Sequence, residues 1–116
     1  MNSVVLNGNS VKISVSVFLF KEGEVYIAYC PSLDLSGYDV TEENAKADFE
    51  YMLKDWLKNQ SMNKTLVKDL IRHGWKIGDK GGYEPKLIEL LHKRETSKVM
   101  EKSDYRKTNV NAEIYG

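Results

Sequence analysis

Residues 11–20 read VKISVSVFLF, a run with a period of two. One face of this run carries only aliphatic residues, and the other carries three polar residues and two phenylalanines. The first face holds Val11, Ile13, Val15, Val17 and Leu19, and the second holds Lys12, Ser14, Ser16, Phe18 and Phe20. Alternation with β-branched residues on one face predicts a strand. The residues on either side predict its neighbours.

Turn-forming residues flank this strand on both sides. Residues 4–6 are apolar and are followed by the triplet NGN, which predicts a short strand and a turn. Residues 21–24, KEGE, predict a hairpin turn in which Gly23 takes a positive φ. Residues 25–30 predict a second strand, which ends at Pro31 because proline has no amide hydrogen to donate.

A third strand and a long helix follow. Residues 35–40 predict the strand, and Gly37 within it marks a position from which a side chain is excluded. Thr41 predicts an N-cap, and Glu42 and Glu43 place negative charge in the first helical turn. Apolar residues then recur at spacings of three and four, at Ala45, Phe49, Met52, Leu53, Trp56 and Leu57. The sequence predicts an α+β fold, a three-stranded antiparallel meander with a long helix packed on one face.

The second half of the chain predicts shorter elements. Thr65 or Asn63 caps a short helix that ends before Gly74. The remaining predicted elements are a brief strand at 75–77, a turn at 78–82, a helix at 86–93 that begins after Pro85, and a C-terminal edge strand at 110–114. We expect a β-β-β-α module at 1–60 and a helical extension with a terminal strand at 61–116, packed on that module.

Charge is balanced over the chain but not along it. The 116 residues, the size of one ordinary domain, hold 17 basic and 17 acidic side chains. Residues 1–63 carry five Lys against nine acidic residues, a net charge of −4, and residues 64–116 carry twelve basic against eight acidic residues, a net charge of +4. The functional interpretation of this asymmetry is that the first half faces a basic partner. The simpler interpretation is chance.

Several classes of protein are not indicated by the composition. The single cysteine, Cys30, forms no internal disulfide, and no set of Cys and His residues predicts a zinc site. No apolar run reaches the ~18–20 residues of a membrane-spanning helix. The first residues lack the basic and apolar segments of a secretory signal. We therefore expect a cytoplasmic protein that needs no cofactor, metal ion or membrane.

Two segments of the sequence resemble the HicB family of antitoxins. Residues 26–33, YIAYCPSL, are similar to the family's Tyr-x-Ala-x-x-Pro-x-Leu segment. Residues 41–45, TEENA, are similar to the Thr-x-Glu-Glu-Ala start of its long helix, with Asn44 directly before the alanine. Gly37 stands where the family has a small residue. The resemblance covers residues 11–57, and residues 66–77 look like the tail of a HicB-like subgroup.

The resemblance implies a partial RNase H fold and a function without catalysis. HicB proteins bind and block HicA toxins, which are small basic enzymes that cleave mRNA. The contact candidates are Asp34, Tyr38, Asp39, Glu42 and Glu43. We also expect a homodimer. The alternative is an orphan HicB-like protein-binding or dimeric scaffold module, without a toxin or catalysis, and a third hypothesis is a degenerate nuclease.

Catalytic hypotheses have simpler structural alternatives. A two-metal nuclease needs several converging carboxylates, but residues 11–20 contain none, and Asp34 and Asp39 flank a turn. Cys30 with His73 or His92 would form a nucleophile and a base, whereas a buried small residue and two helix-end histidines explain the same positions. We therefore expect no enzyme activity.

Surface residues leave two further alternatives open. A basic helix face predicts DNA binding, but solvated lysines are the simpler interpretation and a helix-turn-helix pattern is missing; this face holds Lys64, Lys68, Arg72 and Lys76, with Arg106 and Lys107 later in the chain. Phe18 and Phe20 either pack under the C-terminal half or join Tyr26, Tyr29 and Tyr38 in an interface. An open sheet edge at 110–114 would also accept a strand from a second copy.

Overall fold

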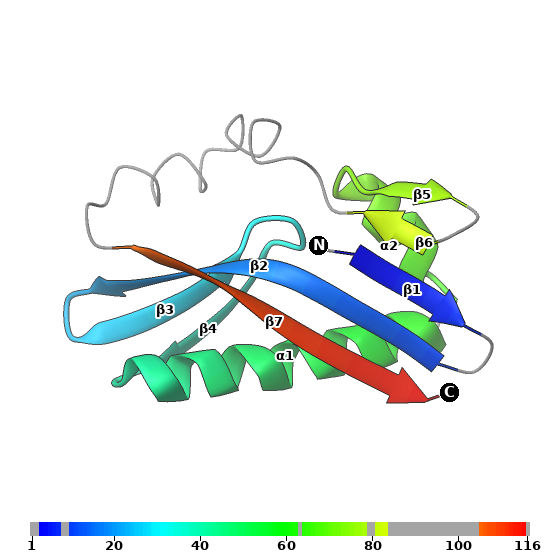
Figure 1. Cartoon of the computed structure of the whole chain (residues 1–116). Coiled ribbons are helices and arrows are strands. Elements are labelled where there is room, and N and C mark those ends of the chain that lie inside the picture. The colour runs from blue at the N-terminus through cyan, green and yellow to red at the C-terminus, as the bar shows by residue number, and fades with distance from the viewer. Residues whose placement is uncertain (1–2, 8–9, 63, 79–80, 84–104, 116) are drawn as a thin grey trace.

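The computed structural model describes residues 3–7, 10–62, 64–78, 81–83 and 105–115. Its elements in chain order are β1 (Ser3–Asn7), β2 (Ser10–Glu22), β3 (Val25–Cys30), β4 (Leu35–Asp39), α1 (Glu42–Met62), α2 (Leu66–Arg72), β5 (Lys76–Gly78), β6 (Gly81–Tyr83) and β7 (Arg106–Tyr115). The described strands form one seven-stranded sheet, with α1 along one face (Figure 1). The α+β class and the meander with its long helix are therefore confirmed.

The long strand β2 organises the sheet through both of its edges. On one edge, β1 pairs antiparallel with residues 10–14 of β2, and β3 pairs with residues 18–22. On the other edge, β7 pairs antiparallel with residues 10–19 of β2. The strand order is β4-β3-β2-β1-β6-β5, with β7 beside β2. The last strand of the chain is therefore built into the sheet that the first strands begin.

The main hydrophobic core lies between α1 and the face of the sheet that it covers, which we call the inner face. The aliphatic residues predicted to share one face of β2 point into this core, where α1 contributes Ala45, Phe49, Leu53 and Leu57 as fully buried residues. β7 contributes Val110 and Ala112. Trp56 is half-buried against the core, and Met52 is 39% exposed. The predicted stripe is therefore correct except at Met52, which lies at its margin.

Helix α1 lies so close to β4 that only glycine fits at the point of contact. A β-carbon on Gly37 would lie 2.4 Å from the backbone nitrogen of Phe49 and 2.8 Å from the carbonyl oxygen of Ala45. The helix begins as predicted, because Thr41 Oγ1 accepts a hydrogen bond from the backbone nitrogen of Asn44 at 3.1 Å. Gly37 and Thr41 together fix where α1 starts and how closely it packs.

The short helix α2 ends in a glycine cap that positions Trp75. Gly74 has φ 91°, its backbone nitrogen donates to Ile71, and the backbone nitrogen of Trp75 donates to Leu70. This pattern confirms Gly74 as the residue that follows the helix. The indole Nε1 of Trp75 then donates to the carbonyl oxygen of Ser32 at 2.9 Å. The bond ties the chain after α2 to the turn between β3 and β4.

A second cluster of buried aromatic residues lies on the opposite face of the sheet, which we call the outer face. Phe18, Phe20 and Tyr29 are buried there, with Ile27 and Tyr105 packed against them. The rings of Phe18 and Tyr105 meet edge to face with centroids 5.6 Å apart. Both faces of β2 are therefore buried from Val15 to Phe20, and Lys21 and Glu22 at its end are exposed.

Several predicted elements differ from the structure or lie outside it. Gly81 and Gly82, predicted as part of the turn at 78–82, belong to β6, which pairs with β5 and with β1. The predicted helix at 86–93 and His92 lie outside the described residues. In the part of the chain that the structure describes, no helix has the length and apolar character needed to cross a bilayer.

Candidate functional site

Four of the five predicted contact residues lie together where β4 turns into α1. Tyr38 and Asp39 end β4, and Glu42 and Glu43 form the first turn of α1. Asp34 precedes β4 at its other end, and a strand of five residues spans about 16 Å. The structure therefore brings four of these residues to one corner of the molecule and leaves Asp34 apart.

Apolar residues at this corner are exposed to solvent. Tyr38 is 57% exposed, and Val40, which sequence reasoning did not select, is 69% exposed. We define the acidic corner as Tyr38, Asp39, Val40, Glu42 and Glu43. Exposed aromatic and aliphatic side chains beside carboxylates are typical of the centre and rim of a protein interface.

Basic neighbours reduce the negative charge of the acidic corner. Arg106 at the start of β7 forms an ion pair with Glu42. Lys21, Tyr26 and Asp39 lie in one row across β2, β3 and β4, and the Lys21 ammonium is 5.6 Å from the Tyr26 ring centroid. Glu43 is exposed, and no ion pair is recorded for it among the described residues. Glu43 is thus the carboxylate most available to a partner.

Asp34 has a local structural role. Its φ is 55°, in the left-handed region that aspartate tolerates better than most residues. Its carboxylate accepts a hydrogen bond from the hydroxyl of Tyr29 at 3.1 Å. These contacts explain why an aspartate occurs in the turn between β3 and β4, and the explanation does not require a binding protein.

Sequence reasoning also missed a carboxylate that finishes the edge of β4. The backbone nitrogen of Tyr38 donates to Asp48 Oδ2 at 2.9 Å. Asp48 lies on α1 one turn before Tyr51 and Met52, both of which are exposed. Tyr51 stands off the apolar stripe, and a large aromatic residue at such a position is the signal that could have indicated this surface.

The proposed thiol nucleophile is inaccessible. Cys30 has an exposed fraction of 0%, and its Sγ lies 3.2 Å from the hydroxyl of Ser32. His73 ends α2, where its backbone nitrogen donates to the carbonyl oxygens of Asp69 and Leu70. A small buried residue and a helix-end histidine are the interpretations that agree with these positions.

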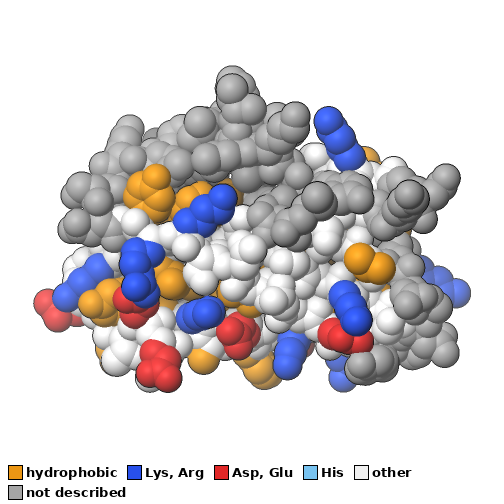
Figure 2. Space-filling view, viewed as in Figure 1, with side chains coloured by type: hydrophobic (Ala, Val, Ile, Leu, Met, Phe, Trp, Pro, Cys, Tyr) orange, Lys and Arg blue, Asp and Glu red, His pale blue; other side chains and the backbone are white. Residues whose placement is uncertain are grey.

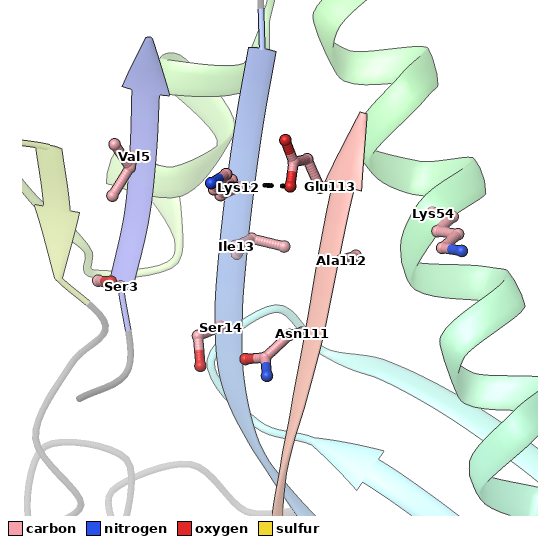
Figure 3. Close-up of a pocket in the computed structure, with 9 residues that line it drawn as sticks. All are labelled: Ser3, Val5, Lys12, Ile13, Ser14, Lys54, Asn111, Ala112 and Glu113. Carbon is pink, nitrogen blue, oxygen red and sulfur yellow. Dashed lines mark ion pairs between the residues drawn. The ribbon is translucent and has the colours of Figure 1, made fainter. Parts of the chain in front are cut away.

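Two hollows lie along β7, and both also reach α1. One, of about 480 Å³, is lined by side chains of β1 and β2, by Asn111, Ala112 and Glu113 of β7, and by Lys54 of α1 (Figure 3). The other, of about 510 Å³, lies between Arg106, Lys107 and Thr108 of β7 and Glu42, Glu43 and Lys46 of α1, beside Leu19. In the first hollow, Lys12 and Glu113 form an ion pair at 3.8 Å. No group of three possible metal ligands occurs among the described residues.

The predicted basic face is present as an exposed row beside α2. Lys64, Lys68, Arg72 and Lys76 are all exposed. Arg72 forms an ion pair with Asp69 at 3.2 Å, and α2 is followed by β5 rather than by a second helix.

Comparison with protein-family models, with curated proteins and with solved structures finds no match for this chain.

Proposed function

We propose that this protein is a HicB-like antitoxin that binds a small basic HicA-type ribonuclease and blocks it by occlusion. The proposal rests on the two motif segments and on the α+β meander with one long helix, the layout that the resemblance implies. The observation that carries it furthest is the exposure of Tyr38 and Val40 beside Asp39 and Glu43.

The acidic corner has the composition expected of a surface for a basic protein. The two exposed apolar residues supply area that is removed from water on binding, and the carboxylates steer a basic partner and set its orientation. Glu42 is already paired with Arg106, so its contribution requires that pair to be shared or broken. Tyr38, Val40 and Glu43 are therefore the residues on which the proposed contact depends most.

Coexpression tests the proposal directly. The protein is produced together with a small basic protein encoded beside its gene, and both growth rescue and copurification are measured. We expect the full-length protein to relieve toxicity and to form a complex. No rescue and no complex would contradict the antitoxin function.

Variants of the acidic corner locate the contact. Tyr38→Ala and Glu43→Lys should each weaken the complex at least about tenfold, the result expected when an interface anchor or a steering charge is lost. Two matched controls are Ile71→Ala on α2, an exposed apolar residue, and Asp55→Lys, about 18 Å along α1 from Glu43. Equal effects of test and control variants would place the contact elsewhere.

One observation favours the alternative of an orphan HicB-like protein-binding or scaffold module. The pairing of Glu42 by Arg106 and the row with Lys21 leave the corner less acidic than the sequence alone predicts. An orphan module would fold normally, show no rescue of a toxin, and still bind a protein partner through Tyr38 and Val40. Pull-down with immobilised protein, compared with its Tyr38→Ala variant, tests that alternative.

A further inference from the structure

The free edge of β7 is the longest open edge among the described strands. β7 spans Arg106–Tyr115 and, of the described strands, pairs only with β2, whereas the free edge of β4 is shorter and its Tyr38 amide donates to Asp48. In Figure 1, β7 crosses the front of the molecule with α1 below it, and no described strand pairs with its free edge. Figure 2 shows the same face, where uncharged side chains and backbone (white) lie between scattered charges. An edge of this length is a template for another strand.

The sequence of β7 is nearly symmetric about Val110. Two pairs of residues at equal distance from Val110 match or complement one another, Asn109 with Asn111 and Lys107 with Glu113, and a third pair, Thr108 with Ala112, shares only small size. In antiparallel pairing about a two-fold axis at Val110, each of these pairs lies directly opposite and on one face of the sheet. The two copies would thus bring Lys107 and Glu113 together twice, once on each side of the axis. Arg106 and Ile114, at the ends, do not match.

Helix α1 carries a second pattern that is symmetric about nearly the same point. Four residues spaced by four lie on one flank and alternate in sign: Glu42, Lys46, Glu50 and Lys54. This flank faces β7, because Glu42 contacts Arg106 and Lys54 lines a hollow with residues 111–113 (Figure 3). An antiparallel second copy of the helix would set Lys46 opposite Glu50, and Glu42 opposite Lys54.

The two patterns share one axis. From Glu42 to Lys54 the helix rises about 18 Å, and from Arg106 to Ala112 the strand extends about 20 Å. These two segments of α1 and β7 therefore have nearly the same length. The centre of the helix pattern lies near residue 48, which this alignment sets beside residues 109–110. The two hollows also fall on either side of Val110, at 106–108 and 111–113.

We infer that two copies of this chain associate through β7, antiparallel about a two-fold axis at Val110, so that one sheet continues across both subunits with the α1 flanks side by side. The interface is isologous, since each contact occurs twice. The inference does not depend on the proposed toxin, because its interface lies at β7 and the flank of α1 that faces it, and this interface shares only Glu42 with the acidic corner.

Charge exchange on α1 tests the inference. Mass and dissociation constant are measured by analytical ultracentrifugation for the full chain. We expect a dimer, with Lys46→Glu and Glu50→Lys each raising the dissociation constant about tenfold, because each replaces two opposite-charge contacts with repulsive ones. The double variant Lys46→Glu/Glu50→Lys should restore the original value. Lys68→Glu on α2 is the control for a charge reversal away from β7 and should change nothing.

Cysteine cross-linking tests the register independently of these variants. Asn109 and Asn111 are exposed, and Cys30 is buried and does not interfere. A mixture of Asn109→Cys and Asn111→Cys should form a disulfide between subunits, because directly opposite β-carbons are about 4.5–5.5 Å apart. Either variant alone should cross-link poorly, since its cysteines would be offset by two residues.

Three results would overturn the inference. The first is a protein that is monomeric at about 100 μM, because a dimer with a dissociation constant below this concentration would be populated. The second is a dimer that is insensitive to the exchange of Lys46 and Glu50. The third is equal cross-linking of Asn109→Cys alone and of the mixture.

Discussion

The two edges of the sheet nearest to α1 are finished in different ways. At β4 the helix packs directly against the strand over Gly37, and Asp48 accepts the hydrogen bond of the Tyr38 backbone nitrogen. At β7, α1 covers Val110 and Ala112 in the core, forms an ion pair at one end of the strand and lines two hollows. The edge of β4 is thus covered through two features, a residue without a side chain and a polar group that accepts a hydrogen bond from the backbone. An edge without these devices is available to a second strand.

The largest effect is expected at the sealed edge, from Gly37→Val. The new side chain would meet the backbone of α1, so the helix must move away from β4. We expect a loss of about 3 kcal/mol in the free energy of unfolding and a fall of about 12 °C in the melting temperature. Urea and thermal unfolding measure both quantities. Ser36→Ala, one residue earlier on β4, is the control, and equal loss in both variants would contradict the close-packing argument.

Trp75→Phe tests whether the turn before β4 is fixed from the second half of the chain. The indole of Trp75 is 3% exposed, and its hydrogen bond to the carbonyl oxygen of Ser32 would be lost in a buried place. We expect destabilisation of about 2 kcal/mol, measured by urea unfolding. Trp56→Phe, at a half-buried position, is the control. A change within error at Trp75 would show that the bond does not hold the turn.

Asp48→Ala removes the group that finishes the β4 edge. The contact is exposed, so we expect a loss of only about 0.5–1 kcal/mol. Asp48→Asn keeps an acceptor and should recover most of the stability. Amide hydrogen exchange at Tyr38 is the specific readout, and it should become faster in Asp48→Ala. Unchanged exchange at Tyr38 would leave the sealing of this edge unexplained by Asp48.

Arg106→Ala, at the open edge, should have the smallest effect on stability. The Arg106 side chain is 71% exposed, and exposed ion pairs contribute about 0.3 kcal/mol, less at high salt. Urea unfolding at low and high salt measures the difference. A loss comparable with that of Asp48→Ala would mean that the β7 edge is held to α1 as firmly as the β4 edge.

The sequence predicted the local elements because their signals are local. Residues 11–20 and 25–30 have a strand period, Thr41 and Gly74 have specific capping roles, and Gly37 lacks a side chain. Each of these features depends on neighbours within a few residues.

The pairing of distant segments was not predictable in the same way. No local pattern shows that β1 and β3 share one edge of β2, or that β7 fills the other. Glycines are typical of turns, and for that reason residues 81 and 82 predict a turn. Gly82 instead lies in a strand that packs close to Val4 and Ile77, which also requires a residue without a side chain. At the candidate site, the carboxylates were identified from their type and position. The pairing of Glu42 depends on Arg106, which lies 64 residues away and joins it only in the folded chain.

The place of β7 beside β2 has a consequence for synthesis of the protein. Until residues 106–115 leave the ribosome, one long edge of β2 has no partner, and β2 contains the most β-prone and apolar run of the chain. The unpaired edge of β2 makes the nascent chain prone to aggregation, and we expect chaperones to bind the chain mainly at this stage. A stop codon just before residue 106 should therefore yield insoluble protein rather than a smaller folded domain, although less than a tenth of the length is lost.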